Sequence, residues 1–171
     1  MVTLVNYTGD EPVALAEVKA QCRIDHDAED AFITEVIIPG ARALAESKTG
    51  SAIRKGTFTD VITLGGTLSV GQVISVDTVK VDGVSVAFTA TEKGRRTAVE
   101  SVGNEGKTAV VGFTAGTDIA QFPGVKSWLL LACGWMYAHR ESLTAGPNAF
   151  NEMPAGYVDA LLSAIDVPDP F

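Results

Sequence analysis

The stretch VISVDTVKVDGVSVAFTA, residues 73–90, decides the fold class of this chain. Branched and aromatic residues alternate with polar ones on both sides of Asp82-Gly83, and this period of two is typical of strands buried on one face. An Asp-Gly pair between two such runs predicts a two-residue turn of type I′, in which both central residues have positive φ. The stretch therefore predicts an antiparallel β-hairpin.

The same alternation extends on both sides of this hairpin, over about residues 57–117. Further strands are predicted in TFTDVITL (57–64), TAVES (97–101) and TAVVGF (108–113). Together these runs predict a small antiparallel sheet of roughly four to six strands.

Outside this region the apolar residues recur with the helical period of about 3.6. Leu15, Val18 and Cys22 predict a short helix after Pro12, and the run 33–44 predicts a second helix that ends before Gly50. Pro123 opens the third and most apolar helix, and Pro154 opens a shorter fourth one with Val158, Leu161 and Ile165 on one face.

Two details of the second helix are predicted as well. Asp27 is expected to cap its first turn, because a carboxylate there accepts hydrogen bonds from unpaired backbone N–H groups. Pro39-Gly40 is expected to kink or split the helix, since proline lacks the backbone donor and collides with the preceding turn.

The predicted fold class is therefore α+β. A small bundle of about four helices, with its core in residues 13–50 and 123–166, carries an antiparallel sheet inserted at about 57–117 between helices 2 and 3. The length of 171 residues suits a single domain, 1–171.

Composition excludes several classes of protein. Hydrophobic residues make up 46% of the chain and charged residues 20%, which indicates a packed core rather than a disordered or coiled-coil chain. With 13 Lys+Arg against 21 Asp+Glu the formal net charge is -8, so sequence-independent binding to nucleic acid is not expected. The sequence shows neither a membrane-spanning segment nor a signal peptide, and synthesis in a cytoplasm is expected.

The motifs that could carry catalysis have simpler explanations. GNEGKT (103–108) resembles the end of a phosphate-binding loop, but it leads into a predicted strand instead of a helix and is read as a turn. The cluster around His26 could bind a divalent metal, yet neighbours in a turn point in different directions and no second cluster supplies more ligands. Cys22 and Cys133 lie in apolar helical patterns, as buried reduced thiols do. No catalytic residue, metal ligand or cofactor is predicted.

In its order of motifs the chain resembles the head-tail connector, or adaptor, proteins of tailed bacteriophages. The resemblance covers most of residues 10–142. It begins in EPVALAEVKAQCRIDHDAEDAFI (11–33), continues through the hairpin VISVDTVKVDG and FTAG (113–116), and closes with MYAHRES at the end of the third helix. The matching positions in the first part are Glu17, Lys19, Arg23, Ile24, Asp25, Glu29, Asp30, Thr49 and Gly50.

The resemblance implies a structural protein of the virion neck, not an enzyme. Such adaptors form a ring of identical subunits, dodecameric on the portal protein, that extends the DNA channel and presents a surface for a stopper or tail-completion protein. DNA would pass through the ring without specific binding, which suits the acidic charge.

Two sets of residues are candidate contacts in such a ring. Arg95 and Arg96, in the only basic cluster, are expected to meet an acidic turn of a neighbouring subunit. The acidic partners are Asp25, Asp27 and Asp30. The C-terminal tail is the candidate for docking on the portal. Its residues are Val167, Pro168, Asp169, Pro170 and Phe171.

Two alternatives remain open at this point. The chain could be another neck or tail-completion protein that acts as a binding module. A less favoured reading is a metal-dependent hydrolase built on the acidic cluster Asp25–Asp30.

Overall fold

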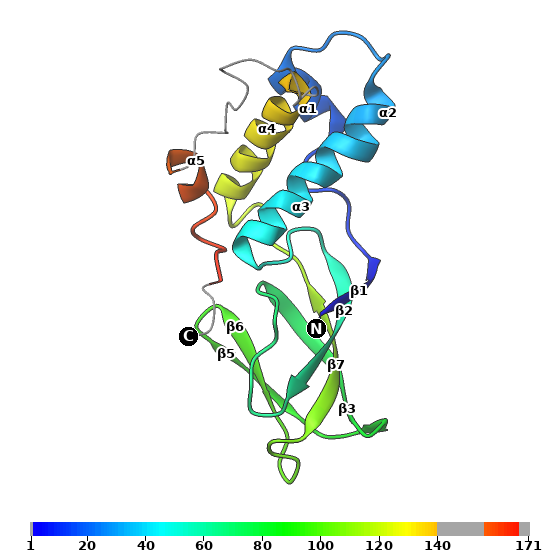
Figure 1. Ribbon diagram of the computed structural model, residues 1–171, viewed down its shortest axis with the longest axis vertical. Coiled ribbons are helices and arrows are strands. Elements are labelled where there is room, and N and C mark those ends of the chain that lie inside the picture. The colour runs from blue at the N-terminus through cyan, green and yellow to red at the C-terminus, as the bar shows by residue number, and fades with distance from the viewer. Residues whose placement is uncertain (1, 140–155, 168–171) are drawn as a thin grey trace, which may run out of the picture. The chain divides into compact units, whose positions relative to one another are not determined.

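The computed structural model describes residues 2–139 and 156–167 (Figure 1). It contains one N-terminal strand, then helices, then six further strands, then helices again, which confirms the α+β class. In chain order the elements are β1 (Thr3–Tyr7), α1 (Leu15–Cys22), α2 (Asp30–Phe32), the π-helical turn η1 (Ile33–Ile37), α3 (Ile38–Thr49), β2 (Gly56–Thr63), β3 (Val73–Val81), β4 (Val84–Ser85), β5 (Thr89–Lys93), β6 (Arg96–Glu100), β7 (Thr108–Ala115), α4 (Pro123–Ala138) and α5 (Tyr157–Ala160).

The chain divides into two compact units. The sheet unit comprises residues 1–10, 46–118 and 165–171, and the helical unit comprises residues 11–45 and 119–164. Each unit thus combines segments that lie far apart in the sequence. The assignment of the chain to a single domain stays a prediction.

The sheet unit contains a five-stranded antiparallel sheet in the order β1-β2-β7-β3-β4 and a two-stranded ribbon, β5-β6. β2 pairs with β7 along its whole length, from Gly56 opposite Ala115 to Thr63 opposite Thr108. β3 pairs with the other side of β7, so the last strand in the chain lies at the centre of the sheet. The predicted antiparallel sheet is confirmed.

The hairpin that opened the sequence analysis forms as predicted. Asp82 has φ 51° and Gly83 has φ 80°, the two positive values that a type I′ turn requires. β4 is short, however, and pairs with β3 only through Val84 and Ser85.

The core of the sheet unit lies on one face of the sheet. Phe113 at its centre is buried and stacks on Phe58, with the ring centroids 5.7 Å apart. The other buried side chains come from the strands, from the segment 64–68 between β2 and β3, and from the connection between α3 and β2. They are Ala52, Ile62, Leu64, Leu68, Val79, Val81, Val99, Ala109, Val111 and Ala115.

One carboxylate is buried within this unit. Asp60, on β2, has no solvent exposure. Its Oδ2 accepts a hydrogen bond from the backbone N–H of Ser69 at 2.9 Å, and its Oδ1 accepts one from Val61, also at 2.9 Å. The carboxylate thereby holds the β2–β3 connection against the sheet.

The helical unit packs α1, the α2–η1–α3 helix and α4 around a shared apolar core. In Figure 1 the α4 helix runs beside α3, and Gly40 permits this approach because a side chain there would meet the Met136 methyl group at 2.8 Å. The largest fully buried side chains of this unit are Trp128, Ile33, Leu129, Val13 and Val18.

The predicted second helix is divided just before Pro39, as expected. The Ile38 N–H donates to the Ile33 carbonyl, five residues back, which is the bond of a π turn. In a regular α-helix the ring of Pro39 would collide with the carbonyl of Glu35, and the wider turn at this point avoids that collision.

This division corrects the predicted insertion point. The sheet follows the third helix, α3, and does not lie between helices 2 and 3. A π turn occurs as a single wide turn within an otherwise helical segment, so the sequence pattern does not reveal where one helix becomes two. The structure buries Ile33, Ile37 and Ala41 of the predicted face but exposes Val36 and Leu44.

The predicted cap of the second helix is also wrong. Glu29 precedes α2, and no side chain caps it. Asp27 is instead bound by the ammonium group of Lys19, from α1, which competes successfully with backbone N–H groups because it carries a full charge.

The start of α4 agrees with the prediction, but α5 ends at Ala160, and residues 161–165 of the predicted last helix form turns. Pro123 occupies the first turn of α4, and the α5 segment packs on α4 at Gly124, where an added Cβ would come within 2.7 Å of the Leu161 carbonyl oxygen. Trp128 Nε1 donates to Asp159 Oδ1 at 3.4 Å. The predicted start of the last helix at Pro154 lies outside the described residues.

Candidate functional site

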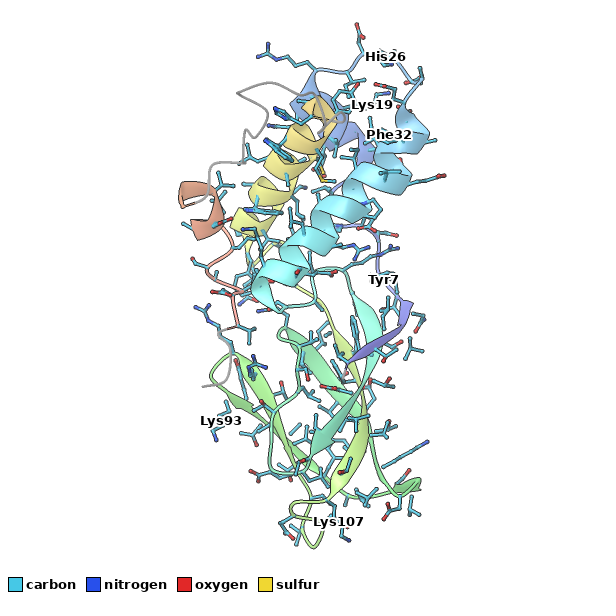
Figure 2. The ribbon with its side chains drawn as sticks, in the orientation of Figure 1. Tyr7, Lys19, His26, Phe32, Lys93 and Lys107 are labelled. Carbon is cyan, nitrogen blue, oxygen red and sulfur yellow. The ribbon has the colours of Figure 1, made fainter. Side chains whose placement is uncertain are left out.

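The basic cluster lies at the tip of the β5–β6 hairpin, where Figure 2 labels Lys93. Lys93 pairs with Arg96 across the hairpin, and Gly94 has the positive φ of 67° that its turn needs. Arg95 is exposed and Arg96 is half-buried. The predicted loop is therefore a tight hairpin tip that holds its cations in fixed positions.

Both arginines make contacts within the sheet unit. Arg95 Nη1 donates to the Asp166 carbonyl at 2.7 Å, and Arg96 Nη1 donates to the Leu68 carbonyl at 3.4 Å. Arg95 thus holds the C-terminal segment, a role that the sequence did not suggest.

The segment Ile165–Val167 is anchored in the same unit by further hydrogen bonds. The Val167 N–H donates to the Thr49 carbonyl at 2.8 Å, and Ser51 Oγ donates to the Ile165 carbonyl at 2.6 Å. Val167 is buried against Gly71. Of the predicted docking tail, Val167 is therefore an internal anchor, and Pro168, Asp169, Pro170 and Phe171 lie outside the described residues.

The acidic turn between α1 and α2 is organised by Lys19. Its Nζ lies 2.6 Å from Asp27 Oδ1 and 2.7 Å from Asp30 Oδ1 (Lys19 and His26 are labelled in Figure 2). The hydrogen bond from Lys19 lowers the pKa of Asp27, and the bonds to Asp27 and Asp30 raise the pKa of Lys19. Asp25 is exposed.

This arrangement weakens the hypothesis that the acidic cluster binds a metal ion. Two of its carboxylates share one ammonium group, and Glu29 accepts a hydrogen bond from the Tyr137 hydroxyl. In residues 2–139 and 156–167 no group of three or more His, Cys, Asp or Glu side chains is arranged to hold a metal ion.

The predicted contact between the arginines and the acidic turn joins two different units of the chain. Arg95 and Arg96 belong to the sheet unit, and Asp25, Asp27 and Asp30 belong to the helical unit. The contact was proposed between neighbouring subunits, and it stays a prediction.

The two edges of the five-stranded sheet were missed by the sequence reasoning. No strand was predicted before residue 57, but residues Thr3–Tyr7 pair with β2 as an edge strand. This strand is exposed along most of its length and carries Leu4 and Val5. The opposite edge exposes Ile74 and Val84. The signal in the sequence was the charge-free run TLVNY.

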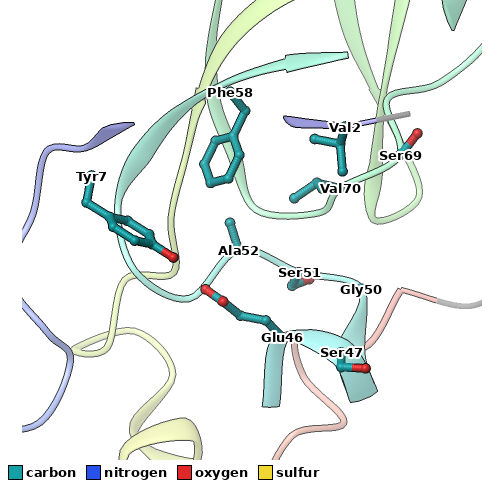
Figure 3. A pocket seen from close by; sticks show the side chains of 10 residues that line it. All are labelled: Val2, Tyr7, Glu46, Ser47, Gly50, Ser51, Ala52, Phe58, Ser69 and Val70. Atoms are coloured by element: carbon teal, nitrogen blue, oxygen red, sulfur yellow. The ribbon is translucent and has the colours of Figure 1, made fainter. Parts of the chain in front are cut away.

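A cavity of about 360 Å³ lies beside β1 in the sheet unit (Figure 3). The Tyr7 hydroxyl and the Glu46 carboxylate lie on one side of it, and Val2 and Val70 on the other. Glu46 Oε1 accepts the Ile53 N–H at 2.9 Å, and the Arg54 guanidinium lies 4.4 Å from the Tyr7 ring centroid. The lining contains no histidine, cysteine or lysine, and two of its polar groups already have partners within the unit: Glu46 accepts the Ile53 N–H, and Ser51 donates to the Ile165 carbonyl.

The two cysteines are free thiols in the helical unit. Cys22 is half-buried and Cys133 is buried. Burial raises the pKa of Cys133 to about 12, with a smaller contribution from the neighbouring Cys22, so this thiol is unreactive at neutral pH.

Comparison with known proteins gives a family match for part of the chain. Residues 12–83 match the family described as phage gp6-like head-tail connector protein. The match confirms, over these residues, the resemblance to head-tail connectors that the sequence motifs indicated. The description is that of a structural connector and not of an enzyme, as predicted.

Solved structures share the fold over the whole chain. A chain in the virion of a native gene transfer agent particle has a TM-score of 0.75 at 22% identity, and one in the neck of an empty gene transfer agent particle computed with C6 symmetry has 0.73 at 20%. A third chain, in the neck of a native particle computed with C12 symmetry, has a TM-score of 0.66 at 20% identity. Each comparison covers 100% of this chain and 97% of the other.

The comparison with curated proteins and the character of the helices assign no further property to the chain. No curated protein matches this chain. Among the residues that the structure describes, none of the helices combines the length and the apolar character needed to cross a bilayer.

Proposed function

We propose that the protein is a head-tail connector in the neck of a phage-like particle. In this proposal identical subunits form a ring on the portal protein, dodecameric there, that extends the DNA channel. The ring then presents a surface for a stopper or tail-completion protein.

The observation that carries the proposal is the family match at residues 12–83 together with a fold that follows neck proteins over the whole chain. The family match covers the helices from α1 to α3 and the strands β2 and β3. The fold similarity adds the rest of the sheet unit and α4, so it supports a connector role for both units.

The symmetries of the similar neck structures support a ring. The similar chains come from necks computed with C6 and C12 symmetry. A closed ring needs heterologous contacts, in which one surface of a subunit meets a different surface of the next. Arg95 and Arg96 at a hairpin tip and the exposed Asp25 in another unit are two different surfaces of opposite charge, as such a contact requires.

The charge supports passage of DNA without binding. A subunit with a net charge of -8, repeated around a channel, repels phosphates and does not hold them. Electrophoretic mobility assays with duplex DNA at about 0.15 M salt are expected to show no complex.

The experiment that tests the proposal uses DNA-filled heads that carry the cognate portal. Purified protein is added, and the particles are imaged by electron microscopy with symmetry averaging. The proposal expects ring density on the portal, and loss of that density when residues 168–171 are deleted, if these residues dock. Binding only to tails, with bare portals, would favour the tail-completion alternative.

A further inference from the structure

We infer that neighbouring copies of this chain join edge to edge, with β1 of one subunit lying along the exposed edge of β3 in the next. This inference rests on the proposed ring and identifies one contact within it. It concerns an interaction surface of the sheet unit alone.

The two edges lie at opposite ends of one sheet. In the order β1-β2-β7-β3-β4, β1 ends the sheet on one side. On the other side, β4 pairs only with Lys80 and Val81 of β3, and the Val86 N–H adds a bond to the Val79 carbonyl. The stretch from Val73 to Thr78 therefore forms the rest of that edge. Strand edges present backbone N–H and C=O groups that can pair with another strand.

Each edge directs an apolar side chain outward at a bulge. The register of β1 shifts between Leu4 and Asn6, and that of β3 shifts between Val73 and Ser75. The residues at these shifts are Val5, which is 62% exposed, and Ile74, which is 57% exposed. Because bulges re-aim side chains and interrupt regular pairing, they favour one matching edge over indiscriminate association.

Charge selects a second copy as the occupant. Subunits of net charge -8 repel one another, so a contact between copies is favoured where the facing segments carry no charge. The segment Val2–Tyr7 contains no charged residue and no proline, and neither does Val73–Val76. Asp77 is the one charged residue of the edge Val73–Thr78, and its carboxylate accepts hydrogen bonds from the Ser75 and Thr114 hydroxyls of the same sheet. Isolated edges of soluble proteins are usually blunted by lysine or proline, and both are missing from these two segments.

The symmetry of such a contact suits the ring. The β1 edge and the β3 edge are different surfaces of the same subunit, so their pairing is heterologous and each subunit keeps one free edge for the next copy. Repetition of such a contact gives a closed ring when the rotation between neighbouring copies adds up to a full turn. The lengths agree as well, since β1 has 5 residues and the β3 segment before Val79 offers a similar span.

The first test compares Val5→Lys and Ile74→Lys with Val61→Lys. Val61 and its partner Val110 are exposed to a similar degree, but they lie on the central strands β2 and β7. Each edge variant is expected to raise the concentration that half-saturates portal-bearing heads by about tenfold or more. The Val61→Lys variant should bind like wild type. Circular dichroism and thermal melting confirm that each variant is folded.

The outcomes separate this inference from the proposed function. If wild type forms no ring on the heads, the proposed function fails. If wild type forms rings and the edge variants do so equally well, or if Val61→Lys is impaired as much as they are, only the edge contact is overturned.

The second test is covalent. In the double variant Val5→Cys/Ile74→Cys, mild oxidation on the heads removes two protons and two electrons from each thiol pair and forms a disulfide between neighbouring copies, with copper-phenanthroline as the oxidant. Gel electrophoresis is expected to show disulfide-linked oligomers longer than dimers, which disappear when a reductant is added. The control Val5→Cys/Val110→Cys should yield none, and equal ladders in both would contradict the inference.

Discussion

Asp60 is the residue on which the sheet unit depends most clearly. Its carboxylate is buried without exposure and accepts hydrogen bonds from the N–H groups of Ser69 and Val61. Burial alone would raise its pKa, but the hydrogen bonds from Ser69 outweigh this effect and hold the pKa below its ordinary value. An ionised carboxylate at this position thus stabilises the turn between β2 and β3.

Replacing this carboxylate tests its structural role. In Asp60→Asn the amide offers one acceptor where two N–H groups point at it, so one buried donor loses its partner. The free energy of unfolding is expected to fall by about 1–3 kcal/mol, measured by urea denaturation. The matched control is Asp77→Asn on β3. The exposed Asp77 carboxylate accepts hydrogen bonds from the Ser75 and Thr114 hydroxyl groups, which can reorient, so the free energy of unfolding should change by no more than about 0.5 kcal/mol.

The same residue predicts a dependence of stability on pH. Because the pKa of Asp60 is lower in the folded chain, its contribution is fully present above the unfolded pKa of about 3.9 and is lost as the pH falls through the folded value. Wild type should therefore lose stability below about pH 4 more steeply than Asp60→Asn. Thermal melting from pH 7 to pH 3 gives the slopes, and parallel curves would show that Asp60 does not contribute.

At the scale of elements, the C-terminal segment is fixed by a close approach to Gly71. A Cβ added there would come within 2.3 Å of Val167 Cγ2 and 2.6 Å of Ser51 Oγ. The segment also receives the hydrogen bonds from Val167 to Thr49 and from Arg95 to Asp166. The φ of Gly71 is not in the left-handed region, so backbone conformation does not require a glycine here. A glycine is required because no space is left for a side chain.

Gly71→Ala is expected to lower the free energy of unfolding by about 1–3 kcal/mol, because the added methyl group overpacks a filled position. Val167→Ala removes the nearer clashing atom. The same Gly71→Ala change should therefore cost less in the Val167→Ala background, and a double-mutant cycle measures the difference. Equal costs in both backgrounds would mean that Val167 does not contact Gly71.

Elements also show what the sequence could predict and why the rest was missed. The β3–β4 turn was predictable because an Asp-Gly pair readily adopts the two positive φ values of a type I′ turn, as Asp82 and Gly83 do. The strand β1 was missed because five residues without clear alternation form a strand only through pairing with β2, a contact between distant segments. The division of the second helix was signalled by Pro39, but its form, a π turn, was not.

The candidate contacts were predictable only as residue types. Sequence identified a basic hairpin tip and an acidic turn, and both exist. It did not reveal that Lys19 binds Asp27 and Asp30, or that Arg95 holds the C-terminal segment, because these partners are 8, 11 and 71 residues away. Such pairings depend on tertiary structure.

At the scale of the whole molecule, the basic hairpin tip is predicted to contact a neighbouring subunit. Charge reversal at both Arg95 and Arg96 should reduce ring formation on portal-bearing heads, measured by sedimentation of the heads with bound protein. Lys93→Glu is the control for charge alone, because Lys93 lies at the same tip. Unchanged assembly of the double variant would remove this contact from the account.

The central claim is that copies of this chain close a ring on a portal. The most direct measurement is single-particle electron microscopy of portal-bearing, DNA-filled heads incubated with the purified wild-type protein. The account predicts a closed ring of this fold beneath the portal, with C12 symmetry as in the neck of the similar particle. A portal that remains bare at saturating protein, or that carries isolated copies without contacts between them, would contradict it.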